Sequence, residues 1–182
     1  HVAGLVAARN EQEYMHVNRD GTRHVVAAAR AVGVSRLILV SSLAAAGPSE
    51  PGRPLAGHES PSPLTAYGRS KLAAEEVVSR SGLPWTIVRP PMIYGPRDTE
   101  VLKAFKVARS GVVPVFGSRQ QELSAIYAPD LADALARVAT EPGTLGRTYY
   151  ACHPRVFTSE EFARAIGRAV RRRKVRIVRL PA

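Results

Sequence analysis

The chain is 182 residues long, 45% of its residues are hydrophobic, and its formal net charge is +11. This length allows one domain of ordinary size with a substantial core, and the apolar content excludes a disordered chain. No apolar stretch approaches the ~20 residues that a membrane span needs, and the first residues show no signal peptide, so we expect a soluble, cytoplasmic protein.

The positive charge suggests a nucleic-acid partner, but its distribution argues against one. Much of the excess lies near the end of the chain, in Arg164, Arg168, Arg171, Arg172, Arg173, Lys174, Arg176 and Arg179. A basic run at the C-terminus of a helix also complements the helix dipole, and no aromatic residues alternate with these side chains to stack on bases. We therefore expect no nucleic-acid partner.

The single cysteine, Cys152, excludes an internal disulfide and is compatible with a reducing compartment. Its neighbour His153 makes a metal pair conceivable, but two ligands do not make a metal site. The pattern favours a buried thiol at the end of a strand, and we expect no metal.

Helical and strand-like segments alternate, which predicts an α/β architecture with a parallel sheet. The first half contains a helix over Glu11–Val32 ended by Gly33, a strand over Arg36–Ser42, a loop over Gly47–Pro63, a helix from the Thr65 cap to Ser81, and a strand over Trp85–Val88. Pro90 and Pro91 cannot donate hydrogen bonds to a sheet, so the chain must leave the sheet there.

Beyond Gly95-Pro96 the pattern becomes mixed. It predicts a helix over Glu100–Ser110, strands over Val112–Phe116 and Leu123–Ala128, a helix over Leu131–Thr140 capped by Asp130, a strand over Thr148–Ala151, a helix from the capping box at Thr158-Ser-Glu-Glu161 to about Arg172, and a strand over Lys174–Leu180.

One motif carries acid–base chemistry. Tyr67 and Lys71 are four residues apart in Tyr67-Gly-Arg-Ser-Lys71, so they share one face of the predicted helix. A fixed ammonium near a phenol lowers its pKa towards neutrality, where proton transfer is efficient. Ser42, at the end of a buried strand, adds a second hydroxyl, so the site is predicted to hold a carbonyl or alcohol oxygen. The competing interpretation of the pair alone is an exposed amphipathic face.

Several motifs together resemble the extended short-chain dehydrogenases/reductases, which include nucleotide-sugar epimerases and dehydratases, dihydroflavonol reductases and 3β-hydroxysteroid dehydrogenases. The motifs that carry the resemblance are His1-Val-Ala-Gly4, Val17-Asn-Arg-Asp-Gly-Thr22, Ser41-Ser42-Leu-Ala-Ala-Ala-Gly47, Tyr67-Gly-Arg-Ser-Lys71 and Arg89-Pro-Pro-Met-Ile-Tyr-Gly-Pro96. A tyrosine common before the family's glycine is Ala46 here.

The resemblance implies a Rossmann-like, doubly wound parallel sheet that lacks its first strands, with a small C-terminal α/β substrate-binding subdomain. Residues 1–96 would form the C-terminal part of the NAD(P)-binding domain, and residues 97–182 mainly the substrate-binding subdomain, interleaved with the first. No glycine-rich turn after an opening strand precedes these motifs, so we expect an N-terminally truncated piece of a longer protein.

The resemblance also implies roles for individual residues. Tyr67 would be the general acid/base, Lys71 would lower its pKa and bind the nicotinamide ribose, and Ser42 would polarise the substrate oxygen. NAD or NADP would lie against Val2, Ala3, Gly4, Leu5, Val40, Ser41, Tyr67, Lys71, Pro90, Pro91 and Met92. For Asn18, a helix-entry cap is favoured over a cofactor contact. A homodimer through the helices at Glu11–Val32 and Tyr67–Ser81 is a further expectation.

Two departures bear on the small-molecule substrate. Nucleotide-sugar members usually carry asparagine where Met92 aligns and arginine where Leu123 aligns, and both contact the diphosphate. Apolar residues at these substrate-binding positions favour a less charged substrate, although Arg119 is an alternative donor. The sequence therefore favours an NAD(P)-dependent oxidoreductase acting on a secondary alcohol or ketone. A nucleotide-sugar epimerase or dehydratase and a non-catalytic cofactor-binding scaffold are the alternatives.

Overall fold

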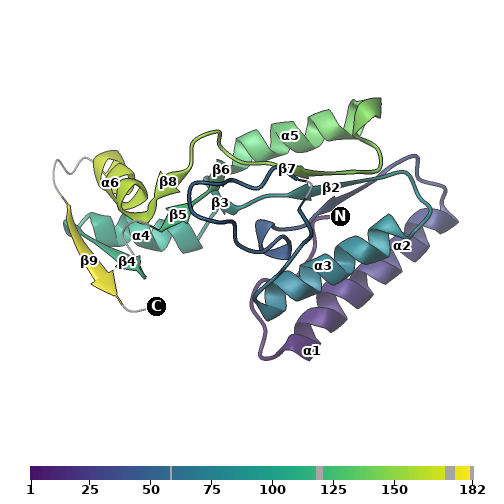
Figure 1. Cartoon of the computed structure of the whole chain (residues 1–182), viewed down its shortest axis with the longest axis horizontal. Coiled ribbons are helices and arrows are strands. Elements are labelled where there is room, and N and C mark those ends of the chain that lie inside the picture. The colour runs from purple at the N-terminus through teal and green to yellow at the C-terminus, as the bar shows by residue number, and fades with distance from the viewer. Residues whose placement is uncertain (58, 118–120, 171–174, 181–182) are drawn as a thin grey trace. The chain divides into compact units, whose positions relative to one another are not determined.

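In the computed structural model, residues 1–57, 59–117, 121–170 and 175–180 are described. The chain forms two compact units that alternate along the sequence: His1–Pro91 with Asp130–Ala151, and Met92–Pro129 with Cys152–Ala182. Figure 1 labels the elements of both. The assignment of one part to the cofactor and the other to the substrate stays a prediction.

The first unit is built on a parallel sheet. Its strands β1 (Leu37–Val40), β2 (Trp85–Arg89) and β7 (Arg147–Tyr150) are hydrogen-bonded in the order β1-β2-β7 within the described residues. Helices α2 (Gly21–Ala31) and α3 (Ala66–Ser79) lie on one side of the sheet and α5 (Ala128–Thr140) on the other (Figure 1). The predicted α/β architecture with a parallel sheet is confirmed.

Both faces of this sheet carry hydrophobic side chains. Leu37, Leu39 and Ile87 join a buried cluster with Val26 of α2 and Val78 of α3. The neighbouring strand positions point to the opposite face, because successive side chains of a strand alternate. Hydrophobic residues at both sets of positions therefore produce the continuous apolar runs of a doubly covered sheet.

The predicted helix over Glu11–Val32 is present but is not regular. It consists of α1 (Glu11–Tyr14), a π-helical segment η1 (Met15–Asp20) and α2, and Gly33 follows with φ of 65°, as expected of a helix-ending glycine. The prediction that Asn18 caps a helix was wrong. Asn10 caps α1 with its side chain, whereas Asn18 is buried inside η1.

The second unit contains short strands in pairs. They are β3 (Met92–Tyr94) with β6 (Ala125–Tyr127), β4 (Val112–Phe116) with β9 (Arg176–Leu180), and β5 (Glu122–Leu123) with β8 (Phe157–Thr158). Helices α4 (Glu100–Ala108) and α6 (Ser159–Ala169) pack on β4, and the core includes Ala108, Val113, Val115, Ala163 and Ile166. The part of the chain that the structure describes also contains two single-turn helices, η2 (Leu43–Ala45) and η3 (Pro142–Thr144).

Some predicted elements need correction. The single strand expected over Leu123–Ala128 is two strands, β5 and β6, with different partners, and α5 already begins at Ala128, so Asp130 lies in its first turn instead of capping it. The capping box at Thr158 is confirmed, with both of its hydrogen bonds present. The predicted helix end at Arg172 and strand start at Lys174 lie outside the described residues.

Two observations concern the surface. Cys152 is exposed, so the expectation of a buried thiol was wrong, because the chain has already left β7 at this residue. None of the helices in the described part of the chain has the length and apolar character that a bilayer crossing requires.

Candidate active site

Helix α3 begins where its sequence predicts. The Thr65 side chain accepts a hydrogen bond from the Gly68 amide at 3.0 Å, which caps the helix just before Tyr67. Gly68 allows α3 to approach the segment after β1, because an added Cβ would lie 2.3 Å from the Ala44 carbonyl oxygen. This close approach brings Tyr67 to Ser42.

The structure joins the two predicted catalytic hydroxyls. The Ser42 side chain lies near enough to the Tyr67 phenol to influence its pKa by hydrogen bonding, and Ser42 accepts a hydrogen bond from the Ala44 amide at 3.1 Å as the N-cap of η2. The Tyr67 ring is tilted against the Tyr14 ring, with 5.9 Å between centroids. The two hydroxyls therefore lie together at the carboxyl end of β1, where ligands bind in parallel α/β sheets.

The expectation that the tyrosine pKa is lowered was wrong for the chain as described. Burial raises the pKa of the Tyr67 phenol, the hydrogen bond from Ser42 opposes this, and Tyr14 raises it further. The physical reason is that removal from water disfavours the phenolate, while the Lys71 ammonium is engaged elsewhere.

Lys71 is buried one helical turn from Tyr67, with 5% of its surface exposed. Its Nζ donates to the Val40 carbonyl oxygen at 2.9 Å. Burial lowers the pKa of Lys71, and the charge of Glu75 acts in the opposite direction. The amine is therefore fixed at the end of β1 and carries an incompletely solvated charge.

A buried polar network anchors this end of the sheet. Glu75 accepts two hydrogen bonds from Arg89, Nε at 3.0 Å and Nη2 at 2.6 Å, and another from the Ser41 hydroxyl. Arg89 Nη1 also donates to the Tyr150 hydroxyl at 3.1 Å. Burial would lower the pKa of Arg89, but its bonds to Glu75 prevail and raise it. The network links α3 to β2, to β7 and to Ser41, the residue that follows β1.

The predicted cofactor residues near the N-terminus lie beside this lysine. Asn18 Oδ1 accepts from the Leu5 amide at 2.7 Å, and its Nδ2 donates to the Leu5 carbonyl at 3.0 Å and to Ser70 Oγ at 2.9 Å. An added Cβ at Gly4 would lie 3.1 Å from Asn18 Oδ1 and 3.6 Å from Lys71 Nζ. The amide of Asn18 thus holds the exposed backbone near Gly4 against the N-terminal half of α3.

The remaining predicted positions divide between the two units. Ser41 and Pro90 lie in the first unit, where the Ser41 amide donates to Val88 O at 2.7 Å and the Leu43 amide donates to Pro90 O at 2.8 Å. Met92, an exposed residue at the start of β3, and Leu123, in β5 opposite Phe157, belong to the second unit. Arg119 lies outside the described residues.

Sequence reasoning missed Tyr14, Glu75 and Tyr150. A signal for Glu75 exists, because it follows Lys71 by four residues and so lies on the same face of α3. Arg89, inside a buried apolar strand, also required an acidic partner. Tyr150, the hydrogen-bond partner of Arg89 in β7, could be predicted only from the order of the strands in the sheet.

The first unit's residues fit the nicotinamide half of a dinucleotide. Gly4 provides open backbone where a Cβ would crowd Asn18, and an amine and two hydroxyls lie close by at the carboxyl ends of the strands. Amines and hydroxyls are the donors that ribose and a reacting oxygen require.

Comparison with known proteins identifies the family. Residues 1–152 match the NAD-dependent epimerase/dehydratase family. The ceramide reductase of Caulobacter vibrioides is 43% identical over 143 residues, which cover 78% of this chain and 40% of that protein. The 3 beta-hydroxysteroid dehydrogenase/Delta 5-->4-isomerase of Vaccinia virus (strain Ankara) is 35% identical over 121 residues, which cover 58% of this chain and 35% of that protein.

The fold has close structural counterparts. MoeE5, solved with UDP-glucuronic acid and NAD, superimposes with a TM-score of 0.86 at 21% identity, covering 99% of this chain and 64% of MoeE5. At this identity the likeness shows the fold alone. The chain spans about 40% of the length of the ceramide reductase that it matches.

Proposed function

Because this chain belongs to the NAD-dependent epimerase/dehydratase family, we propose that it is part of an NAD(P)-dependent oxidoreductase that interconverts a ketone and a secondary alcohol. The observation that carries this proposal is the proximity of the Tyr67 and Ser42 side chains, close enough for Ser42 to influence the phenol pKa, with the amine of Lys71 buried one helical turn away. A solvated amphipathic face would not bury the lysine or bond its Nζ to a strand carbonyl.

In the reduction, a bound nicotinamide supplies the hydride that the carbonyl carbon accepts. Ser42 donates a hydrogen bond to the carbonyl oxygen, and Tyr67 transfers its phenolic proton to that oxygen as the C=O bond becomes a C–O single bond. The product is a secondary alcohol, and the tyrosinate regains a proton from solvent. In the oxidation, Tyr67 removes the proton from the hydroxyl.

Lys71 supports both directions through its charge. A phenol whose pKa is raised by burial is a weaker acid, so the tyrosinate needs a cation nearby when the proton leaves. We propose that Lys71 Nζ exchanges its bond to Val40 O for the ribose of the cofactor and stabilises the tyrosinate. The cofactor is proposed to lie against the backbone of Val2, Ala3, Gly4, Leu5, Val40, Ser41, Pro90 and Pro91.

The proposed substrate lacks a diphosphate. Met92 and Leu123 are apolar where the family's nucleotide-sugar members contact that group. The 43% identity to a ceramide reductase also favours a weakly charged carbonyl substrate. We therefore propose that the substrate is oxidised or reduced overall, and not epimerised or dehydrated.

Cofactor stoichiometry tests this function on the whole protein. A panel of ketones is incubated with NADH or NADPH, and cofactor consumption is compared with alcohol formed. We expect one NAD(P)H consumed per alcohol. Turnover of a nucleotide sugar with no net change in NAD(P)H would instead establish an epimerase or dehydratase and refute the proposal.

Two further expectations belong to the proposal. The single cysteine agrees with a reducing, cytoplasmic location.

We also propose a homodimer formed through α1–α2 and α3. Light scattering of the purified protein tests it, and a monomer at micromolar concentration would refute it.

A further inference from the structure

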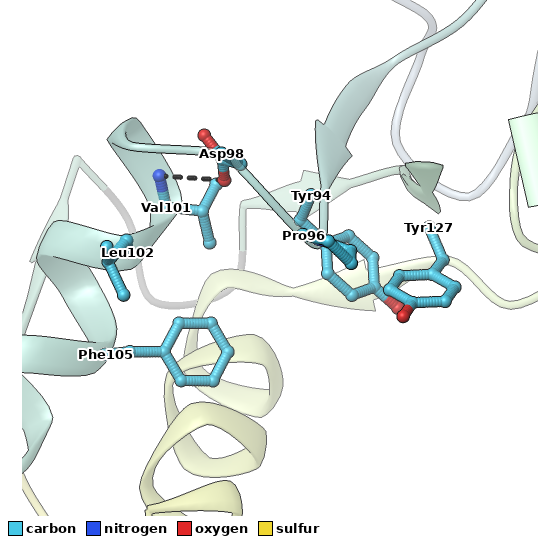
Figure 2. A pocket seen from close by; sticks show the side chains of 8 residues that line it. Tyr94, Pro96, Asp98, Val101, Leu102, Phe105 and Tyr127 are labelled. Carbon is cyan, nitrogen blue, oxygen red and sulfur yellow. Dashed lines mark hydrogen bonds between the residues drawn. The ribbon is translucent and has the colours of Figure 1, made fainter. Parts of the chain in front are cut away.

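A pocket of about 370 Å³ lies within the second unit, between α4 and the ends of β3 and β6 (Figure 2). It is lined by Tyr94, Gly95, Pro96, Asp98, Val101, Leu102, Phe105 and Tyr127. Its volume is in the range of small-molecule sites, and most of its lining is aromatic or aliphatic.

Strand pairing builds one wall of this pocket. Tyr94 and Tyr127 are partners in the parallel register of β3 and β6, and their rings lie 5.6 Å apart between centroids. Gly95 follows with φ of 140°, and an added Cβ there would lie 2.9 Å from the Tyr127 ring. The glycine therefore makes the space in which the Tyr127 ring lies.

Helix α4 forms the other wall, and Asp98, which precedes this helix, gives the wall its negative charge. Figure 2 shows Val101, Leu102 and Phe105 on the side of the helix towards the tyrosine pair. Asp98 accepts hydrogen bonds from the amides of Glu100 at 2.9 Å and Val101 at 3.1 Å, so its carboxylate occupies the start of the helix. Among the described lining residues none is basic, and the carboxylate repels phosphate.

We propose that this pocket binds the aliphatic chain of a weakly charged small molecule. The pocket alone supports this assignment: Leu102 and Tyr127 expose 43% and 38% of their surface, and an uncharged chain covers them without desolvating an anion.

The test measures binding to the chain itself, without cofactor or turnover. The probes are 2-hexanone, 2-octanone and 2-decanone, and the amide signals of residues 92–108 are followed by NMR. Each CH₂ that enters the pocket should lower the Kd about fourfold, the factor that corresponds to ~0.8 kcal/mol per buried CH₂.

A matched pair of variants localises the binding. Leu102→Gln changes a lining residue, and Val107→Gln changes a residue of the same helix that is 42% exposed and does not line the pocket. Because both side chains are exposed, both variants should fold. We expect Leu102→Gln to raise the Kd of 2-decanone about fivefold and Val107→Gln to leave it unchanged.

Three results would overturn the proposal: a Kd that does not depend on chain length, equal effects of the two variants, or UDP-glucose binding that Leu102→Gln weakens. The proposed function can fail separately. If 2-decanone binds as expected but the whole protein reduces no ketone, the pocket assignment stands and the oxidoreductase does not.

Discussion

Two opposing effects act on Tyr67. Burial raises the pKa of its phenol, and the hydrogen bond from Ser42 lowers it. Lys71, the cation that motif reasoning assigns to lowering this pKa, is bonded to the Val40 carbonyl. A protonated tyrosine suits proton donation to a ketone, whereas the reverse reaction needs the tyrosinate to be stabilised. The protonation state of Tyr67 therefore depends on where Lys71 Nζ bonds.

The raised pKa gives a testable titration. In the chain with ¹³C-labelled tyrosine, the Tyr67 signal, assigned with Tyr67→Phe, should titrate above the ordinary tyrosine pKa of ~10. Ser42→Ala should raise the pKa further, because it removes the hydrogen bond that opposes burial. A Tyr67 pKa at or below that of a free tyrosine would contradict this electrostatic description.

The same shift affects stability with a definite sign. A phenol with a raised folded-state pKa stabilises the fold fully below the unfolded-state pKa, and this contribution is lost as the pH rises through the folded-state pKa. The free energy of unfolding of the parent chain should therefore fall above pH ~10 more steeply than that of Tyr67→Phe. Parallel curves from denaturant titrations would show that Tyr67 is not shifted.

At the scale of elements, Gly68 determines how closely α3 approaches the Ser42 segment. Gly68→Ala would place a Cβ 2.3 Å from the Ala44 carbonyl oxygen, which is backbone and cannot move aside cheaply. We expect destabilisation of about 1–3 kcal/mol by chemical denaturation and separation of the Tyr67 and Ser42 side chains.

The control is Gly21→Ala, at the start of α2, where an added Cβ meets nothing within 4 Å. Because alanine favours helix over glycine, this variant should be neutral or slightly stabilising. If Gly68→Ala behaved in the same way, the close packing of α3 on η2 would be refuted.

The ion pair between Glu75 and Arg89 connects α3 to β2. Its side chains are 6% and 7% exposed, so Arg89→Met would leave a buried carboxylate without its cation and should cost about 3–5 kcal/mol of unfolding free energy. The comparison is Arg53→Met, which breaks the exposed pair with Glu50 and should cost nothing measurable. Equal effects would mean that the buried pair is not formed.

The sequence predicted those elements whose causes are local. Thr65 and Thr158 cap their helices through bonds to residues three positions later, and Pro90 and Pro91 end β2 because they lack amide hydrogens. The separate partners of β5 and β6, the π-helical segment with Asn18 and the bond from Lys71 to Val40 depend on contacts between distant residues. Hydrophobic periodicity along the sequence carries no information on such contacts. The Tyr67-Gly-Arg-Ser-Lys71 motif predicted which residues form the site, but it did not predict that the pKa of Tyr67 is raised.

At the scale of the whole molecule, the chain alternates between two units. The hydroxyl pair and the buried lysine belong to the first unit, and the apolar pocket belongs to the second. Each unit carries its own proposal, acid–base chemistry in one and recognition of an aliphatic chain in the other. Because the chain spans about 40% of the ceramide reductase, activity is to be measured on the whole protein.

The most direct test of the central claim is kcat for ketone reduction by the Tyr67→Phe variant of the whole protein, with Tyr14→Phe as control. Tyr14 has its ring 5.9 Å from Tyr67 but donates its hydroxyl to the Val6 carbonyl, so its removal should change kcat little. We expect a loss of about 100-fold or more for Tyr67→Phe in a normally folded protein. An unchanged kcat would show that the Tyr67 hydroxyl transfers no proton.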